Sequence, residues 1–354
     1  MNGKKWSITL IVSFFILLIG LGGVVVVLDP YFHYHAPLEG LAYVLGPAEY
    51  TNDGISKHFS YQAMITGTSM TRDFQPDEAE TLFDKEFIRI TYLGEGFKRI
   101  NDNLQSAINA NPDLELVIRG IDPIWFVTDK NWLGYDDYPE YLYDSNLWND
   151  VNYLYNKDIF WGDVVPLMLR TIHNETSTLF NPVPFMGEPP GGKELVLAEY
   201  DRPEKELKAI DQAETDEFFR MMNENLEENV ISTITANPDI TFYLFIPPYS
   251  ICWWDGLNQY GTDVLLRRIA MERAALEKLL AYDNVRLFSF SNNFELTCNL
   301  DNYVDDIHYH GGVSSKILHW MKEGKYELTL ENYEEYIEEI TAFYTTYDYD
   351  GIFE

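Results

Sequence analysis

Cysteine is scarce in this chain of 354 residues, which contains only Cys252 and Cys298. Neither residue belongs to a Cys-x-x-Cys pair or to a Cys/His ligand pattern, which excludes a disulfide-rich scaffold and makes a structural zinc site unexpected. One disulfide and two buried thiols are both compatible with this spacing. The chain is long enough to bury a substantial core in one large domain or two small ones without such cross-links.

Basic residues are also few: 25 Lys and Arg stand against 57 Asp and Glu, for a formal net charge of −32. Every acidic residue follows position 28. This charge argues against binding to nucleic acid and against docking on anionic lipid through a basic face. Solubility in a salty or acidic exterior explains the acidity better than specific cation binding does.

Long hydrophobic runs are absent except for one, Trp6–Leu28. It contains no charged residue and is long enough to cross a hydrocarbon core of about 30 Å. Because Lys4 and Lys5 precede it and Asp29 follows it, the positive-inside rule predicts a cytoplasmic N-terminus and an extracellular remainder of the chain. The run ends without an Ala-x-Ala pattern, which favours an uncleaved anchor in the cell membrane over a cleaved signal peptide.

After the anchor, five short apolar runs alternate with segments of helical periodicity. The predicted strands are Tyr61–Thr66, Phe87–Leu93, Leu114–Ile121, Ile240–Ile246 and Val285–Phe290. Helices are predicted around Pro76–Asp84, from Phe97 to Asn111, through Phe219–Val230, at Thr262–Leu280 and near Ser314–Met321. This alternation predicts a mainly parallel five-stranded sheet covered on both faces.

The predicted organisation has five parts. They are a cytoplasmic tip at 1–5, the anchor at 6–28, a stalk at 29–60, the α/β domain at 61–325 with an insertion at 122–205, and an acidic tail at 326–354. The insertion is too long for an ordinary connection, and long loops of this kind tend to shape ligand sites.

Two motifs follow predicted strands, at the sheet edge where parallel sheets bind ligands. Gly67-Thr68-Ser69 follows the first strand and would present the Ser69 hydroxyl at that edge. After the last strand comes an Asp-x-x-His pair, Asp305 and His308, in which a carboxylate could orient an imidazole. A serine activated by such a pair is the arrangement of covalent hydrolases and acyltransferases.

Simpler interpretations exist for each motif. Ser69 could cap the next helix, His308 could be a packed surface histidine, and the two aspartates could lie in a solvated loop. A metal site formed by Asp305, Asp306, His308 and His310 is the least favoured alternative, because no distant ligand group accompanies them. No metal and no cofactor are therefore expected.

The Gly-x-Ser turn and the Asp-x-x-His pair together resemble the SGNH (GDSL-type) hydrolase superfamily over roughly residues 60–325. The phrases YLYD, FNP, PPYS and LDNYVDDIHY are similar to membrane-anchored SGNH-like proteins of bacterial cell-surface polysaccharide clusters, and more distantly to the DltD proteins of teichoic acid D-alanylation. The resemblance implies a three-layer α/β/α sandwich. It also implies Ser69 as nucleophile, His308 as base and Asp305 as its partner, with Asp306 as the substitute acid.

The same resemblance implies oxyanion donors, for which Ser69, Gly96 and Asp122 are the candidates. Of Gly94 and Gly96, which both follow the second strand, Gly96 is preferred because it opens the next helix. Asp122 stands where the family has an asparagine, and an ionised carboxylate cannot donate a hydrogen bond. Asp122 could instead be protonated, be replaced by another donor, or cap the residues around Pro123.

Aromatic residues after the fourth strand are candidate substrate contacts. Tyr249, Trp253 and Trp254 follow Pro247-Pro248 and could form a rim that stacks carbohydrate. The alternative is that the prolines stop the strand and the tryptophans pack inward.

The sequence thus predicts an extracytoplasmic serine esterase or O-acyltransferase that acts on acyl groups, acetyl above all, of an exported cell-surface polysaccharide. The alternative is a non-catalytic glycan-binding or assembly protein on a degenerate SGNH scaffold. Expected partners are a cell-surface glycan or teichoic-acid-like polymer, the membrane through residues 6–28, and a membrane acyltransferase or export machinery. Nucleic acid is not expected.

Overall fold

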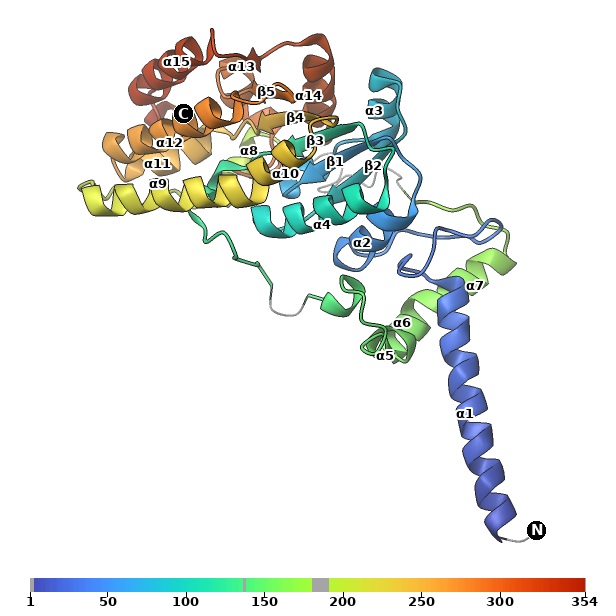
Figure 1. The fold of residues 1–354 in the computed structure, drawn as a ribbon. Coiled ribbons are helices and arrows are strands. Elements are labelled where there is room, and N and C mark those ends of the chain that lie inside the picture. Colours follow the sequence, from blue (N-terminus) through green and yellow to red (C-terminus); the bar gives the residue numbers. More distant parts are fainter. Residues whose placement is uncertain (1–2, 136–137, 180–190, 354) are drawn as a thin grey trace. The chain divides into compact units, whose positions relative to one another are not determined.

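The computed structural model describes residues 3–135, 138–179 and 191–353, and the chain divides into two compact units (Figure 1). The N-terminal unit comprises Met1–Ser60 and Asp136–Asn181. The α/β unit comprises Tyr61–Tyr135 and Pro182–Glu354. Residues 180–190, which belong to the predicted insertion, lie outside the described residues.

The α/β unit is built on a mostly parallel sheet with the strand order β2-β1-β3-β4-β5-β6. The strands are β1 (Ala63–Gly67), β2 (Phe87–Thr91), β3 (Leu116–Gly120), β4 (Thr241–Ile246), β5 (Val285–Ser289) and β6 (Glu327–Leu328). All five predicted strands are present and pair in parallel, which confirms the α/β fold class. The chain reverses its direction across the sheet between β1 and β3, and the space outside the carboxyl ends of the strands there is the usual ligand position in such sheets.

Helices cover the sheet on both faces (Figure 1). In the α/β unit they are α3 (Pro76–Phe83), α4 (Phe97–Ala110), α8 (Lys193–Glu199), α9 (Gln212–Leu226), α10 (Ser232–Ala236), α11 (Ile251–Gln259), α12 (Thr262–Leu279), α13 (Phe294–Thr297), α14 (Gly311–Glu323) and α15 (Tyr333–Thr346). Helices α3 and α14 contact each other in one layer, and α9 contacts both α4 and α12 in the opposite layer. The nearly all-apolar central strands are therefore buried from both sides.

The C-terminal segment, expected from sequence to be an acidic tail after residue 325, is part of the α/β unit. Strand β6 pairs antiparallel with β5 and adds a sixth strand at the edge of the sheet. Helix α15 packs against α12, and Tyr336 and Tyr344 are buried there with their hydroxyls hydrogen-bonded to Glu272 and to the Ser291 carbonyl. The acidic residues of this segment lie on the solvent side, which is why composition alone suggested a tail.

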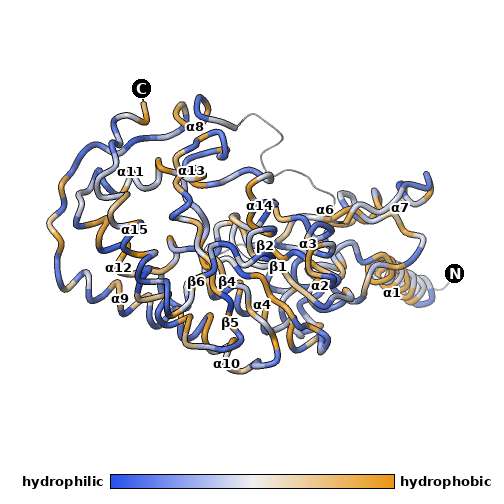
Figure 2. The backbone as a smooth tube through the Cα atoms, turned by 90° about the horizontal axis from the view of Figure 1, so that it is seen from above, coloured by the Kyte–Doolittle hydropathy of each residue, from blue (hydrophilic) through white to orange (hydrophobic). Residues whose placement is uncertain are grey.

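The N-terminal unit begins with helix α1 (Gly3–Leu28), which is hydrophobic along its length (Figure 2). Its length and apolar composition are sufficient to cross a membrane, and most of its side chains are exposed in the folded chain. The unit also contains α2 (Ala48–His58), α5 (Val151–Leu154), α6 (Lys157–Ile159) and α7 (Val165–Ile172).

The predicted stalk, 29–60, is folded against residues 138–179 in this unit. Tyr31 stacks on Tyr153 and its hydroxyl donates a hydrogen bond to Asp163. Val25 of α1 and Leu142 belong to the same buried cluster. The sequence separation of these partners exceeds one hundred residues, so no local pattern could reveal that the central part of the predicted insertion packs against the predicted stalk.

Candidate active site

The turn after β1 presents Ser69 at the carboxyl edge of the sheet. Thr68 is the N-cap of a short 3-10 helix, Ser69–Thr71, and its hydroxyl accepts a hydrogen bond from the Met70 N–H at 3.3 Å. Capping is therefore performed by Thr68, in contrast to the interpretation of Ser69 as a cap. The Ser69 Oγ lies 2.7 Å from His308 Nε2.

The loop after β5 holds His308 in place for this contact. Its Nδ1 lies 2.7 Å from Asp305 Oδ2, while Asp305 Oδ1 accepts hydrogen bonds from the backbone N–H groups of Ile307 and His308 at 2.8 and 2.6 Å. The Tyr309 hydroxyl donates to the Met70 carbonyl at 2.6 Å and so ties this loop to the serine turn. The structure thus brings Ser69, His308 and Asp305 into one hydrogen-bonded chain.

The negative charge of Asp305 and a positive charge on His308 stabilise each other. Burial lowers the pKa of His308, but the hydrogen bond and negative charge of Asp305 outweigh it and raise the pKa above the ordinary 6.5. Burial raises the pKa of Asp305, yet its bonds to His308 and Ile307 lower it below the ordinary value overall. Burial and the charge of Asp305 raise the pKa of Asp306, and the carboxylate that lies 2.7 Å from His308 Nδ1 is that of Asp305.

A cavity of about 320 Å³ opens beside the serine. It is lined by Ser69, Met70, Leu93, Gly94, Asp122, Ile124, Trp125, Ile307 and His308. Most of these side chains are apolar, and the polar ones are the serine, the histidine and one carboxylate. An apolar pocket with a few convergent polar groups is the usual form of a small-molecule site.

The glycines after β2 are placed differently from the sequence expectation. Gly94 lines the cavity, whereas the preferred candidate, Gly96, is the N-cap of α4 and does not. A Cβ on Gly96 would point at the Trp132 ring, 3.1 Å away. Gly94 has a left-handed backbone with φ of +65°, which brings it to the cavity. Of these two glycines, Gly94 is therefore the one that lines the Ser69 cavity.

Asp122 is buried at the end of β3 and also lines the cavity. Its carboxylate accepts hydrogen bonds from the Thr68 hydroxyl at 2.8 Å, from the Tyr249 hydroxyl and from the Ile124 N–H at 3.3 Å. Burial raises its pKa to about 6, although these bonds and the nearby positive charges oppose the shift. Asp122 therefore combines the capping role considered from sequence with a position in the cavity wall.

The aromatic residues after β4 do not form the expected sugar-stacking rim. Trp254 is 1% exposed and stacks on Tyr344 at 3.8 Å between ring centroids, so it belongs to the core. Tyr249 is buried and bonds to Asp122, and Trp253 packs on Tyr249 at 4.6 Å. None of the three lines the cavity beside Ser69. The double proline follows the end of the strand, Tyr249 and Trp254 pack inward, and Trp253 is partly buried.

Several residues that the sequence did not single out shape this site. Thr68 positions Asp122, and Ile124 and Trp125 form part of the cavity wall from the start of the predicted insertion. Arg268, from α12, lies over the rings of Phe126 and Trp253 at 5.1 and 5.5 Å from their centroids and lowers the pKa of Asp122. Arginine on an otherwise ordinary helix carries no sequence signal for such a position.

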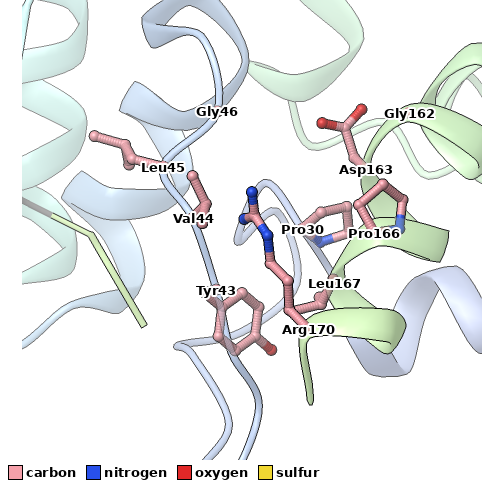
Figure 3. A pocket seen from close by; sticks show the side chains of 10 residues that line it. All are labelled: Pro30, Tyr43, Val44, Leu45, Gly46, Gly162, Asp163, Pro166, Leu167 and Arg170. Atoms are coloured by element: carbon pink, nitrogen blue, oxygen red, sulfur yellow. The ribbon is translucent and has the colours of Figure 1, made fainter. Parts of the chain in front are cut away.

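The N-terminal unit has a separate and smaller cavity of about 120 Å³. Figure 3 shows Arg170 extending from α7 into the space between the Tyr43–Gly46 segment and Pro30. The Asp163 carboxylate at its wall accepts the hydrogen bond of Tyr31. The described residues that line this smaller cavity include no serine, cysteine or histidine. They therefore contain no counterpart to the hydrogen-bonded Ser69, His308 and Asp305.

Two further sequence alternatives concern cysteines and metals. Cys252 and Cys298 are free thiols in the structure. His310 caps α14 through its ring, whose Nδ1 accepts a hydrogen bond from the Gly312 N–H at 3.1 Å. Among the described residues no group of three His, Cys, Asp or Glu side chains is arranged to hold a metal ion.

The fold and this site together define an α/β protein in which serine, histidine and aspartate side chains are linked by hydrogen bonds at the carboxyl edge of a parallel sheet. No protein-family model and no curated protein matches this sequence. Among solved structures, the chain is similar to a Streptococcus pneumonia protein with the provisional description platelet activating factor. The identity is 12%, the TM-score is 0.39, and the match covers 78% of this chain and 90% of that one.

Proposed function

We propose that this protein is a serine esterase or O-acyltransferase of the SGNH type. The observation that carries the proposal is the chain of two 2.7 Å contacts from Ser69 Oγ through His308 to Asp305, next to an apolar cavity. A neutral His308 accepts the Ser69 proton at Nε2, while Asp305 orients the ring and stabilises the imidazolium that forms.

The reaction proceeds in two steps. Ser69 Oγ bonds to the carbonyl carbon of an ester, and the bond from that carbon to the alcohol oxygen breaks as His308 returns its proton to the departing alcohol. The product is an acyl group on Ser69. In hydrolysis, water then attacks this ester with His308 as base and releases the acid; in transfer, a second hydroxyl attacks and a new ester leaves.

The size and lining of the cavity limit the acyl group. The apolar walls of Met70, Leu93 and Ile307 favour a short apolar acyl chain. Acetyl fits this environment. The strongly acidic chain further disfavours an anionic acyl donor approaching from solvent.

The location proposed for this activity is the outer face of the cell membrane. Helix α1 is long and apolar enough to be a single-pass anchor, and Lys4 and Lys5 precede it. An anchored esterase would stay close to a polymer leaving the cell, which raises its effective concentration. The proposed substrate is therefore the O-acetyl group of an exported cell-surface polysaccharide.

Release of acetate from an O-acetylated polysaccharide by the purified full-length protein tests this function. The native chain is expected to release acetate, and Ser69→Ala and His308→Ala are expected to lose at least 100-fold of the rate. Ser232→Ala is the matched control, because Ser232 lies exposed on α10 and its hydroxyl donates a hydrogen bond to the Glu228 carbonyl one turn earlier. Equal acetate release by Ser69→Ala and the native chain would refute the assignment.

Asp122 favours a second candidate function, a glycan-binding or assembly protein on this scaffold. A carboxylate that is ionised above pH 6 stands in the cavity where a donor to the oxyanion would be useful, and losing one such donor costs about 2.7 to 4 kcal/mol of barrier. Polysaccharide binding that persists in Ser69→Ala, together with no acetate release by the native chain, would support this alternative.

A further inference from the structure

A patch of large apolar side chains is exposed on residues 147–161 of the N-terminal unit, which we call the 147–161 segment. Trp148 is 89% exposed, Leu147 74% and Trp161 69%, and Val151 and Tyr155 are about half exposed. Scattered apolar residues on a surface are ordinary, but several large ones within fifteen positions mark an interaction surface.

This segment lies against the apolar helix α1. Elements α5 and Phe160–Val164 contact α1, and Figure 1 shows α5 and α6 beside its outer half. The Tyr155 hydroxyl donates to the Leu18 carbonyl at 3.3 Å, and a Cβ on Gly22 would lie 3.0 Å from that hydroxyl. The glycine thus permits close approach, as small residues do between membrane helices.

The contact lies below the outer end of α1. Leu18 is ten residues before Leu28, the last residue of α1, or about 15 Å along a helix that rises 1.5 Å per residue. A helix from Trp6 to Leu28 is about 34 Å long, slightly longer than the hydrocarbon core of about 30 Å, so the Tyr155 hydroxyl reaches toward the middle of the bilayer when α1 spans it.

Three carboxylates around this segment, those of Asp29, Asp150 and Asp163, are bonded within the protein, whereas Asp158 is exposed. Asp29 is fully buried and accepts hydrogen bonds from the N–H groups of residues 33–35 and from the Tyr153 hydroxyl. Asp150 is buried and accepts from the Tyr34 hydroxyl at 3.0 Å, and Asp163 accepts from Tyr31. Polar groups satisfied within the protein are what contact with lipid requires.

We infer that the 147–161 segment is a second membrane element, inserted into the outer leaflet beside α1. Its occupant is phospholipid, because the exposed apolar patch is continuous with the surface of α1 that itself faces lipid. Trp148 and Trp161 carry aromatic rings of the kind that favour the interfacial region, while Tyr155 reaches deeper along α1. The exposed Lys157 and Asp158 require the polar end of the segment to stay near the headgroups, so the segment does not cross the bilayer.

This inference rests on α1 spanning the bilayer and is independent of the esterase activity. Its consequence is that the N-terminal unit is held at the membrane surface by two contacts. The residues after Leu28 then do not act as a free stalk.

Spin-label depth measurements on the full-length chain test the inference. Trp148→Cys and Trp161→Cys are labelled in vesicles of phosphatidylcholine and phosphatidylglycerol, and Leu207→Cys, 73% exposed on the α/β unit, is the matched control. Signal from Cys252 and Cys298 is measured on the unsubstituted chain and subtracted. Labels at 148 and 161 are expected to collide several-fold more with oxygen than with a water-soluble nickel chelate, and the label at 207 is expected to show the reverse.

Two outcomes would overturn it. Nickel accessibility at 148 and 161 equal to that at 207 would place the segment in water. Low accessibility to both probes would show that a protein, either a second copy or another membrane protein, covers the patch in place of lipid.

A pair of glycine variants checks the role of α1 separately. Gly22→Leu is expected to displace Tyr155 and shift the label at 148 toward the nickel chelate, while Gly23→Leu is expected to change nothing, because a Cβ at Gly23 meets no atom within 4 Å. An equal membrane depth of the label at position 148 in the two variants would contradict the packing of this segment on α1.

Discussion

His308 is the residue whose protonation controls the proposed chemistry. It acts as a base only when neutral, and the carboxylate of Asp305 raises its pKa by stabilising the charged form. Activity that depends on neutral His308 therefore increases with pH through a midpoint above 6.5. The same carboxylate holds the ring toward Ser69, so it contributes to geometry as well as to the pKa.

Asp305→Asn tests both contributions. Without the charge, the pKa of His308 falls and the rising limb of the rate against pH moves to lower pH. The maximum rate is expected to fall by roughly 10²–10⁴, the usual contribution of a positioned base. The measurement is ester hydrolysis from pH 5 to 9, and an unmoved midpoint would mean that another group controls the profile.

Asp122 and His308 favour catalysis in opposite pH ranges. Its pKa of about 6 means that it donates a hydrogen bond only below that pH, where His308 is mostly charged. Asp122→Asn places an amide donor in the cavity at every pH and keeps a carbonyl acceptor for the Tyr249 hydroxyl. We expect tenfold or greater acceleration of ester hydrolysis at pH 8, measured with the native chain alongside. A slower Asp122→Asn would show that the carboxylate itself is required.

Asp122 also affects folding in a defined direction. An acid whose pKa is raised by burial from 3.8 to about 6 favours the folded state fully below pH 3.8, and this contribution is lost as pH rises through 6. Asp122→Asn should therefore raise the melting temperature by a few degrees at pH 8 and by less at pH 5. Calorimetry at the two pH values measures this, and an equal shift at both would rule out the ionisation as its cause.

At the scale of elements, the ends of strands position the site. Ser69 follows β1, Gly94 follows β2 and Asp122 follows β3, so three adjacent strands of a parallel sheet bring them together. These positions could be predicted because buried strands and their terminal glycines have strong local patterns. The sequence also predicted that Asp305 and His308 would follow the last long strand.

Other features of the elements have no local signal. Strand β6 has only two residues, too few for any periodicity. Trp253 and Trp254 are adjacent in sequence but lie on different sides of α11, and only packing against Tyr344 decides which is buried. Gly94 lines the cavity, and Gly96 does not. This difference depends on the left-handed backbone of Gly94, which the sequence does not reveal.

Gly94→Ala tests the importance of the turn after β2. Its backbone is left-handed, and a Cβ there would lie 2.5 Å from the Tyr135 hydroxyl, so we expect a loss of several degrees in melting temperature and at least tenfold in hydrolysis rate. Gly256→Ala, in α11, is the control and should be neutral or slightly stabilising, because its Cβ would make only an ordinary contact with the Tyr200 hydroxyl at 3.6 Å. Equal effects of the two substitutions would argue against a special role for this turn.

At the scale of the whole molecule, the proposed anchor and the proposed active site lie in different units. Every residue of the Ser69 cavity belongs to the α/β unit, whereas α1 belongs to the N-terminal unit. Replacing residues 6–28 by a cleavable signal should leave hydrolysis of a small soluble ester within twofold of the native rate. Deacetylation of the polymer on cells should fall, because the local concentration is lost. A large loss on the small ester would show that the units are coupled.

The central claim is that Ser69 is a nucleophile activated by His308, and covalent labelling with an active-site phosphonate tests it most directly. Mass spectrometry of the labelled full-length chain is predicted to place a single adduct on Ser69, with strongly reduced labelling in His308→Ala and normal labelling in Ser232→Ala. An adduct of equal yield in Ser69→Ala, or none in the native chain, would contradict the account.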